Sequence, residues 1–263
     1  MHRQRRLTSA ACRAALGSLA LPGCASRVPL AEDRPTVHIL SGGAAMGLVS
    51  RLQPSFEAQY GCRISGTYGA VGLMREKLVA GEPCDLLILS QKLITDLGAS
   101  GHTDLAAARP VGQVKTGLAL MEGRPPVNVR NQAELKALLQ SATAIYFPDP
   151  AKATAGIHFM KVLQSLGLAQ DTAKLRPYPN GNTAMTAMAK AGDPKAVGCT
   201  QVTEIIITPG VKLTGLLPAP FELATVYTAA VSNAAKNPKL AQALMAQLTA
   251  AEHAETRRVS GFV

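Results

Sequence analysis

The fold is decided by residues 36–60, which read TVHILSGGAAMGLVSRLQPSFEAQY. Val37–Leu40 has the apolar character of a short buried strand, and Ser41–Gly42–Gly43 after it is a run of small residues typical of a tight junction. Ala44–Tyr60 carries apolar residues at spacings of three and four, which predicts a helix, and Gly61 ends it. A strand that passes through a small-residue junction into a helix is the repeating unit of α/β proteins.

The same alternation continues on both sides of a breaker cluster at Pro125–Pro126. We predict strands at 63–67, 85–89, 113–121, 144–147, 196–200 and 225–232, and helices at 71–80, 132–139, 155–166, 182–191 and 238–251. With 263 residues the chain is long enough for two α/β units. We therefore expect two lobes joined by two chain crossings, with lobe one near 34–117 and 206–263 and lobe two near 118–205.

Composition supports a folded protein and excludes several classes of partner. A hydrophobic fraction of 47% with 17% charged residues provides enough apolar surface for a buried core. The absence of Trp and an aromatic content of 4% argue against a stacking surface for single-stranded nucleic acid. The net charge is +10, but four of the 27 basic residues lie in the first 26 and no dense Lys/Arg run follows. We expect anionic ligands to be mildly favoured and no nucleic-acid partner.

The first 26 residues have the order of an export signal. They begin with a basic stretch, continue with the short apolar run Ala14–Leu21, and end in small residues. This predicts a periplasmic protein, although Arg13 interrupts the apolar region and leaves an unstructured extension as the alternative. Leu21–Pro22–Gly23–Cys24 also resembles a bacterial lipoprotein cleavage box. Lipidation of Cys24 would anchor the protein, whereas cleavage after Ala25 would release it.

Cysteine usage and motif content predict neither a metal nor a cofactor. Beyond the leader, Cys62, Cys84 and Cys199 form no C-x-x-C pair and have no His at ligand spacing, so a zinc site is not expected. We expect small buried thiols, and spacing alone does not decide whether two of them form a disulfide. The sequence also lacks the glycine-rich nucleotide motifs, HExxH and GxSxG.

The strand-to-helix junctions are the strongest candidates for a binding site. Four of them consist largely of small residues: Ser41–Ala44, Tyr68–Gly72, Thr154–Gly156 and Gly181–Thr183. The first N–H groups of a helix lack an intrahelical acceptor and lie at the positive end of the helix dipole, so each junction could bind an anion. Because ligands of open α/β sheets bind beyond the carboxyl ends of the strands, we expect one small anion in a cleft between the lobes. The alternative is a set of ordinary turns, with Ser41, Thr154 and Asn182 acting only as helix caps.

In this order, the junctions resemble those of the periplasmic molybdate-binding proteins and of the wider class of extracellular solute-binding proteins of ABC importers. The likeness runs from Pro35 to Phe262 and includes Gly81–Ile88, Asp149–Pro150 and the closing Gly261–Phe262. It implies a two-lobed type II periplasmic binding fold. It also implies capture of a small anion and its delivery to the membrane subunits of an ABC transporter. We expect a monomer.

The resemblance also implies where the ligand binds. Carried over by position, the oxyanion contacts of the family fall on Ser41, Val71, Ala155, Gly181–Asn182 and Gln201. The full set of expected ligand-binding residues is Ser41, Gly42, Gly43, Ala70, Val71, Ala155, Gly156, Gly181, Asn182, Gln201 and Glu204. Val71 has no hydroxyl where the family has a serine, and Gln201 stands where the family has a tyrosine. These losses disfavour molybdate, because each missing hydrogen bond to a charged group costs about 1.5–3 kcal/mol. The added Gly43, Asn182, Gln201 and Glu204 suit a larger ligand that is carboxylate-bearing or neutral and polar.

A second interpretation is enzymatic. The Ser–Gly–Gly opening and the Gln201–x–x–Glu204 segment also resemble a branch of the same fold that contains aconitate isomerase, a periplasmic enzyme that moves a proton along a tricarboxylate. Proton abstraction requires a base within about 3 Å of the carbon acid, and Glu204 and His158 are the candidates. The alternative for each is structural: a capping or paired carboxylate at Glu204, and an ordinary surface or core histidine at His158.

Overall fold

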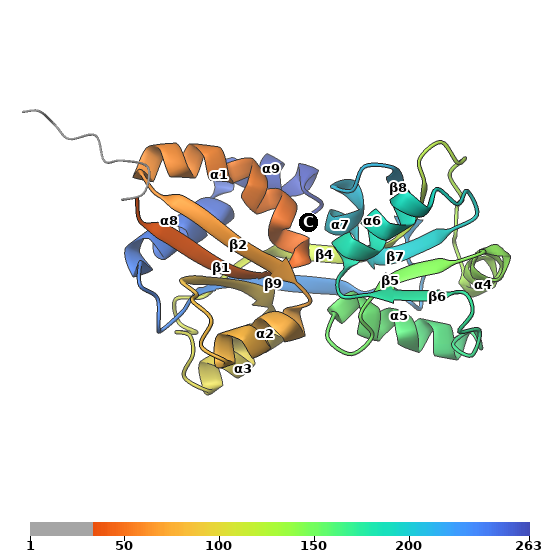
Figure 1. Ribbon diagram of the computed structural model, residues 1–263, viewed down its shortest axis with the longest axis horizontal. Helices are drawn as coiled ribbons and strands as arrows, with labels where there is room; N and C mark the ends of the chain where they lie inside the picture. Colours follow the sequence, from red (N-terminus) through yellow and green to blue (C-terminus); the bar gives the residue numbers. More distant parts are fainter. Residues whose placement is uncertain (1–33) are drawn as a thin grey trace, which may run out of the picture. The chain divides into compact units, whose positions relative to one another are not determined.

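The computed structural model describes residues 34–263. The predicted export signal, including Cys24, lies outside the described residues. The chain first builds β1 (Thr36–Gly42), η1 (Gly43–Ala45), α1 (Met46–Tyr60), β2 (Arg63–Gly69), α2 (Val71–Val79), β3 (Leu86–Ser90) and α3 (Gln91–Ala99). It returns to the same unit at its end with β9 (Ala224–Val231), α8 (Pro238–Thr249), η2 (Ala251–His253) and α9 (Ala254–Val259). We call these elements the first lobe (Figure 1).

The second lobe is built from the middle of the chain. Its elements are α4 (Gln132–Ser141), β5 (Ile145–Pro148), α5 (Thr154–Ser165), β6 (Leu175–Tyr178), α6 (Gly181–Ala191), β7 (Val197–Gln201), α7 (Val202–Ile206) and β8 (Val211–Leu216). β4 (Arg109–Met121) belongs to both lobes. The strand order is β2-β1-β3-β9-β4-β7-β5-β6, with β8 paired to β4 outside this path.

The long strand β4 carries the chain from one lobe to the other. Its part from Arg109 to Lys115 pairs with β9, whereas its part from Thr116 onward pairs with β7 and β8. The chain returns between the end of β8 and the start of β9, so it crosses twice between the lobes (Figure 1). Within each lobe the strands β2-β1-β3 and β7-β5-β6 pair in parallel. Parallel strands place their carboxyl ends on one edge, which is where the candidate site lies.

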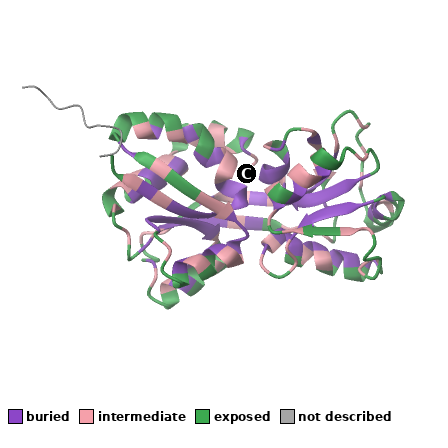
Figure 2. Ribbon diagram, viewed as in Figure 1, coloured by how far each residue is buried: buried purple, intermediate pink, exposed green. Residues whose placement is uncertain are grey.

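Each lobe has its own apolar core, visible as buried strands between partly exposed helices (Figure 2). In the first lobe, Phe56 of α1 packs with strand residues such as Leu87. In the second lobe the sheet is covered on both faces, by a cluster around Phe147 and Phe159 and by another around Met185.

The predicted lobe boundaries stay a prediction. β8 packs in the second lobe, because its Val211 and the following Leu217 belong to these clusters.

The elements that sequence periodicity did not predict are short or half-exposed. They are α3, β6, α7, β8 and α9. α7 has five residues, too few for a helical period to be visible, and β6 is an edge strand that contains Pro177. In the part of the chain that the structure describes, no helix combines the length and apolar character required to cross a membrane.

The cysteines Cys62, Cys84 and Cys199 are buried free thiols. Burial raises the pKa of Cys84 to about 12 and that of Cys199 well above its ordinary value. These thiols are therefore protonated at neutral pH and do not act as nucleophiles.

Candidate functional site

The carboxyl ends of strands from both lobes surround one small cavity. Its lining residues follow or end β1, β2, β5, β6 and β7, with one residue from β9: Gly43, Gly69, Ala70, Val71, Pro148, Ala153, Thr154, Ala155, Asn180, Gly181, Gln201, Glu204 and Tyr227. The volume is about 20 Å³, which is close to the room needed by one water molecule. A larger ligand therefore requires the lobes to separate before it binds.

The predicted junctions converge on this cavity. Gly43 opens η1, Val71 opens α2, Thr154 opens α5 and Gly181 opens α6, and all four line the same space. Of the expected binding residues, those that line it are Gly43, Ala70, Val71, Ala155, Gly181, Gln201 and Glu204. Whether these residues bind a ligand stays a prediction.

The other expected binding residues lie behind the cavity wall. Ser41 is fully buried and its hydroxyl donates to the carbonyl of Gly42 at 2.8 Å. A side chain at Gly42 would meet Val71 and Tyr227, and one at Gly156 would overlap the backbone before α5, so both glycines permit close packing. Asn182 directs its side-chain amide to Thr208 at 3.3 Å. These residues shape the site without lining it.

Glu204 dominates the chemistry of the cavity. It lies in the first turn of α7, 4% exposed, and accepts a hydrogen bond of 2.6 Å from the Thr200 hydroxyl. Burial raises the pKa of Glu204, although hydrogen bonds from Thr200 and from the backbone N–H groups of Asn182, Gly181 and Gln201 oppose this shift. The predicted anion seat at the start of α6 is thus occupied by a carboxylate of the protein itself.

Two glycines from different lobes make room for this carboxylate. A Cβ at Gly181 would overlap Glu204 Oε2 and the Thr200 hydroxyl, and a Cβ at Gly43 would overlap Glu204 Oε1. Glu204 therefore bridges the start of α6 in its own lobe and the start of η1 in the other lobe. Any larger residue at either position would push the carboxylate out of place.

Gln201 and Tyr227 complete the polar lining. Gln201 is 2% exposed, and its Nε2 donates to Thr225 Oγ1 on β9 at 3.4 Å. Its Oε1 has no hydrogen-bond partner among the described residues. Tyr227 is also buried, and burial together with the nearby charge of Glu204 raises the pKa of its hydroxyl, which stays protonated.

Sequence reasoning missed three polar contributors to the site. Tyr227 and Asn180 line the cavity, and Thr200 holds Glu204. Asn180, rather than the expected Asn182, caps α6 by accepting from the N–H of Thr183 at 2.9 Å. A Thr four residues before a Glu is a weak signal that could have indicated the Thr200 contact, whereas no local pattern marks Tyr227.

His158 lies away from the cavity. It is on α5, and its Nε2 is 2.8 Å from the carbonyl oxygen of Phe221, which packs against the core of the second lobe. His158 is not among the residues that line the cavity. Of the two candidate bases, only Glu204 is placed where it could reach a ligand in the cleft.

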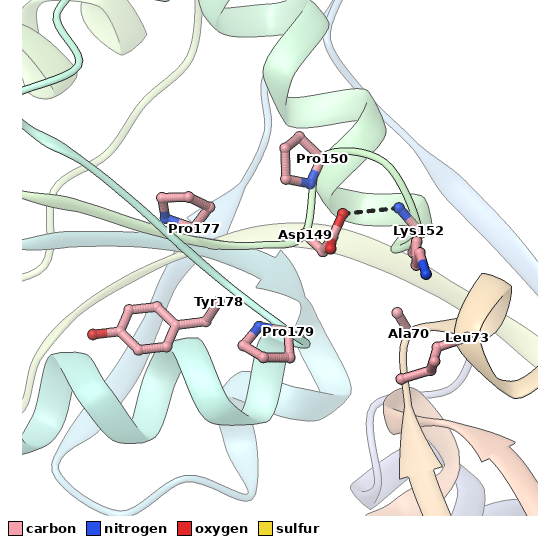
Figure 3. A pocket seen from close by; sticks show the side chains of 8 residues that line it. All are labelled: Ala70, Leu73, Asp149, Pro150, Lys152, Pro177, Tyr178 and Pro179. Atoms are coloured by element: carbon pink, nitrogen blue, oxygen red, sulfur yellow. Dashed lines mark hydrogen bonds between the residues drawn. The ribbon is translucent and has the colours of Figure 1, made fainter.

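A larger open pocket adjoins the cavity, because Ala70 lines both spaces. This outer pocket has a volume of about 430 Å³. Ala70 and Leu73 form its first-lobe side, opposite Lys152 and Asp149 of the second lobe (Figure 3). Two contacts join the lobes at this edge. The N–H of Gly72 donates to the carbonyl of Lys152 at 3.0 Å, and the Lys152 ammonium lies 2.7 Å from the carboxylate of Glu76.

The arrangement can bind a small polar molecule through backbone donors and buried acceptors. Helix starts offer N–H groups, while Glu204 and Gln201 offer oxygen atoms. Within residues 34–263, no group of three His, Cys, Asp or Glu side chains is placed to hold a metal ion.

Comparison with known proteins places this geometry in context. Aconitate isomerase of a Pseudomonas species is 25% identical over 257 residues, which cover 94% of each chain. The periplasmic molybdate-binding protein of Azotobacter vinelandii superposes with a TM-score of 0.71 at 19% identity, over 86% of this chain and 98% of that chain. The sulfate-binding protein of Mycobacterium tuberculosis does so with a TM-score of 0.67 at 18% identity, over 87% of this chain and 86% of that one.

These structural likenesses confirm the predicted two-lobed type II periplasmic binding fold. The family match extends over residues 37–263, nearly all of the described chain. The chain therefore belongs to the family of bacterial extracellular solute-binding proteins.

Proposed function

We propose that the chain captures a small anion, a carboxylate in preference to molybdate, between its lobes in the periplasm and delivers it to the membrane subunits of an ABC importer. The observation that carries this proposal is the convergence of helix starts from both lobes on one small cavity. Donors from both lobes can contact one ligand only when the lobes close around it. Binding energy thereby stabilises the closed form, which a membrane partner can recognise.

The preference for a carboxylate follows from the donors that the cavity lacks. Val71 offers a backbone N–H without a hydroxyl, and the oxygen of Gln201 accepts hydrogen bonds without donating them. A fully deprotonated tetrahedral oxyanion presents acceptors in every direction, so it cannot satisfy these groups. A carboxylate presents its acceptors at one end only and can turn this end toward the helix starts.

Calorimetry with an anion panel tests the proposal. The panel contains molybdate, tungstate, sulfate, phosphate, and di- and tricarboxylates, each titrated into the purified protein. We expect a carboxylate to bind more tightly than molybdate. In the variant Val71→Ser, which adds a hydroxyl at the start of α2, molybdate binding should improve roughly tenfold. Tight binding of molybdate by the unaltered protein would contradict the carboxylate preference, and failure of every anion to bind would contradict the proposal itself.

A second candidate function is isomerisation of a bound tricarboxylate, and the position of Glu204 favours it. A buried carboxylate whose pKa is raised is a better base than an exposed one, and it faces the ligand space. The resemblance in sequence to aconitate isomerase supports the same reaction class. In this reaction Glu204 would take a proton from the saturated carbon, the double bond would shift, and the proton would return to the far carbon.

NMR of aconitate incubated with the protein in deuterated buffer tests the second candidate. Isomerisation would appear as interconversion of the cis and trans forms with exchange of the methylene proton. Glu204→Gln should abolish it, whereas His158→Gln should retain it, because His158 lies outside the cavity. The absence of both conversion and exchange in the unaltered protein would exclude this function.

A further inference from the structure

The cavity is lined by a buried carboxylate and by a buried amide oxygen that has no donor among the described residues. Glu204 contributes a carboxylate, 4% exposed, and Gln201 contributes an oxygen that is buried without a donor. The amide nitrogen of Gln201 donates to Thr225, so the atom of this side chain that has no partner in the described part of the chain is its acceptor oxygen. Across the described chain, no Lys, Arg or His side chain lines the cavity to offset these oxygens.

Buried acceptors of this kind determine what a ligand must bring. A buried acceptor without a donor costs about 1–3 kcal/mol, and the cost is larger when the group is charged. A donor-free anion placed against Glu204 would add repulsion between like charges in a site with little water. Backbone N–H groups at the starts of α2 and α5 can bind one end of an anion. At the other end, Glu204 already accepts hydrogen bonds from Thr200 and from the start of α6 but keeps its negative charge, and the oxygen of Gln201 has no donor from the described chain.

We propose that Glu204, together with Gln201, makes the cleft selective for small anions that carry a hydroxyl group, hydroxycarboxylates in the first place. The carboxylate of the ligand would face the helix starts, and its hydroxyl would donate to Glu204 with Gln201 as a second acceptor. This inference rests on the proposed function, because it assigns the ligand class of the same cleft. An anion that lacks a hydroxyl could then bind only with a proton held between itself and Glu204.

The surroundings of Glu204 leave no other group to supply that proton at neutral pH. Thr200 of β7 and the backbone of Gly181 and Asn182 of α6 face it from the second lobe, and Gly43 of η1 faces it from the first. These groups are neutral and do not titrate. Tyr227 of β9 is the titratable neighbour, and burial holds it in its protonated form.

Matched ligand pairs that differ by a hydroxyl test the selectivity. Malate and succinate form one pair, citrate and tricarballylate another, and hydrogen phosphate with sulfate extends the test to inorganic anions. Affinities are measured by calorimetry at pH 5 and pH 8 on the full chain. At pH 8 we expect the hydroxyl-bearing member to bind at least about tenfold more tightly. The ligand without the hydroxyl must bind together with a proton. Its affinity should therefore fall by up to about tenfold for each unit by which the pH rises.

Variants show which residue is responsible for the hydroxyl preference and which for its pH dependence. Glu204→Gln, which replaces the carboxylate by an amide of similar shape, should abolish the preference for the hydroxyl and the pH dependence. Gln201→Leu should reduce the preference without removing the pH dependence. Glu252→Gln is the matched control, because this carboxylate is 78% exposed on η2 and lies outside the cavity.

The outcomes separate this inference from the proposed function. Equal binding of malate and succinate at pH 8, or a hydroxyl preference that persists in Glu204→Gln, would overturn the inference while leaving anion capture intact. If no anion binds under any condition, both the hydroxyl selectivity and the proposed anion capture are wrong.

Discussion

The two lobes contribute different chemistry to the same cleft. The first lobe supplies small residues and backbone through Gly43, Ala70 and Val71, with Tyr227 as its polar side chain. The second lobe supplies the buried acceptors Glu204 and Gln201. From this difference we expect the second lobe to recognise the ligand and the first lobe mainly to close over it. Changes in the second lobe should therefore alter specificity, and changes in the first should alter closure.

The largest expected effects are on the free energy of unfolding, when a core residue of either lobe is truncated. Phe147 in the second lobe and Phe56 in the first are fully buried. Phe147→Ala and Phe56→Ala should each lower the free energy of unfolding by about 3–5 kcal/mol, through lost burial and the cavity that remains. Urea unfolding followed by circular dichroism measures the loss. The control is Val79→Ala, since Val79 is 57% exposed and should change stability by less than about 0.5 kcal/mol. A loss confined to one of the Phe variants would show that the other core does not limit stability.

The next effect distinguishes ligand recognition from lobe closure. It compares substitutions at Gly43 and Gly181, where an added side chain would meet the Glu204 carboxylate. Gly181→Ala places a methyl group against Glu204 and Thr200 within the second lobe, so the clash is present whether the cleft is open or closed. Gly43→Ala places it against Glu204 from the other lobe, so opening relieves the clash. Overpacking costs about 1–3 kcal/mol, which corresponds to roughly fivefold to 150-fold in affinity. We expect both variants to bind carboxylates more weakly, and only Gly181→Ala to lower the melting temperature as well.

Gly215→Ala controls for the loss of a glycine as such, because a Cβ at Gly215 meets no atom within 4 Å. Its affinity and melting temperature should match those of the unaltered protein. If Gly43→Ala lowers the melting temperature as much as Gly181→Ala does, the lobes do not separate in the unliganded protein and the comparison between them fails.

The strand-to-helix junctions could be predicted from the sequence. Most of the chemical difference between the two lobes could not. The small residues at Ser41–Gly43 and at Gly181 identified the helix starts because strand and helix periods are local properties. Glu204 was predicted as a binding residue, which stays a prediction, but its contact with Gly43 joins residues from different lobes. Such a contact depends on how the lobes close, and no local pattern encodes it.

The same limit explains why Tyr227 was missed and Ser41 was expected in the cavity. Tyr227 lies on β9, which enters the first-lobe sheet antiparallel to β3, so it reaches the site from a strand far away in sequence. Ser41 opens the predicted junction, but the strand β1 extends to Gly42, so Ser41 is a buried strand residue whose hydroxyl donates to the carbonyl of Gly42. A shift of one residue in a strand moves a side chain to the opposite face.

A smaller effect concerns pH and Glu204. Its pKa in the folded protein is raised above the ordinary value of 4.5. The folded state therefore holds more protons than the unfolded state between these two values, and its stability falls as pH rises through this window. Glu204→Gln should remove this part of the pH dependence, so the variant gains stability relative to the unaltered protein above pH 4.5. Urea unfolding from pH 4 to pH 8 measures the difference, with Glu252→Gln as the control. A difference that grows toward acid pH would have the wrong sign and would contradict the assignment.

The smallest expected effect is at the outer edge, where Lys152 and Glu76 form an ion pair between the lobes. Both side chains are substantially exposed, at 43% and 52%, so water and salt screen their attraction. Lys152→Met, Glu76→Gln and the double variant should each weaken carboxylate binding by at most about fivefold at low salt. The effect should vanish in concentrated NaCl, and the backbone hydrogen bond from Gly72 to the carbonyl of residue 152 should persist in every variant. Calorimetry on this double-mutant cycle isolates the pair. A loss comparable to that of Gly181→Ala would mean that the surface pair, rather than the buried acceptors of the second lobe, controls capture.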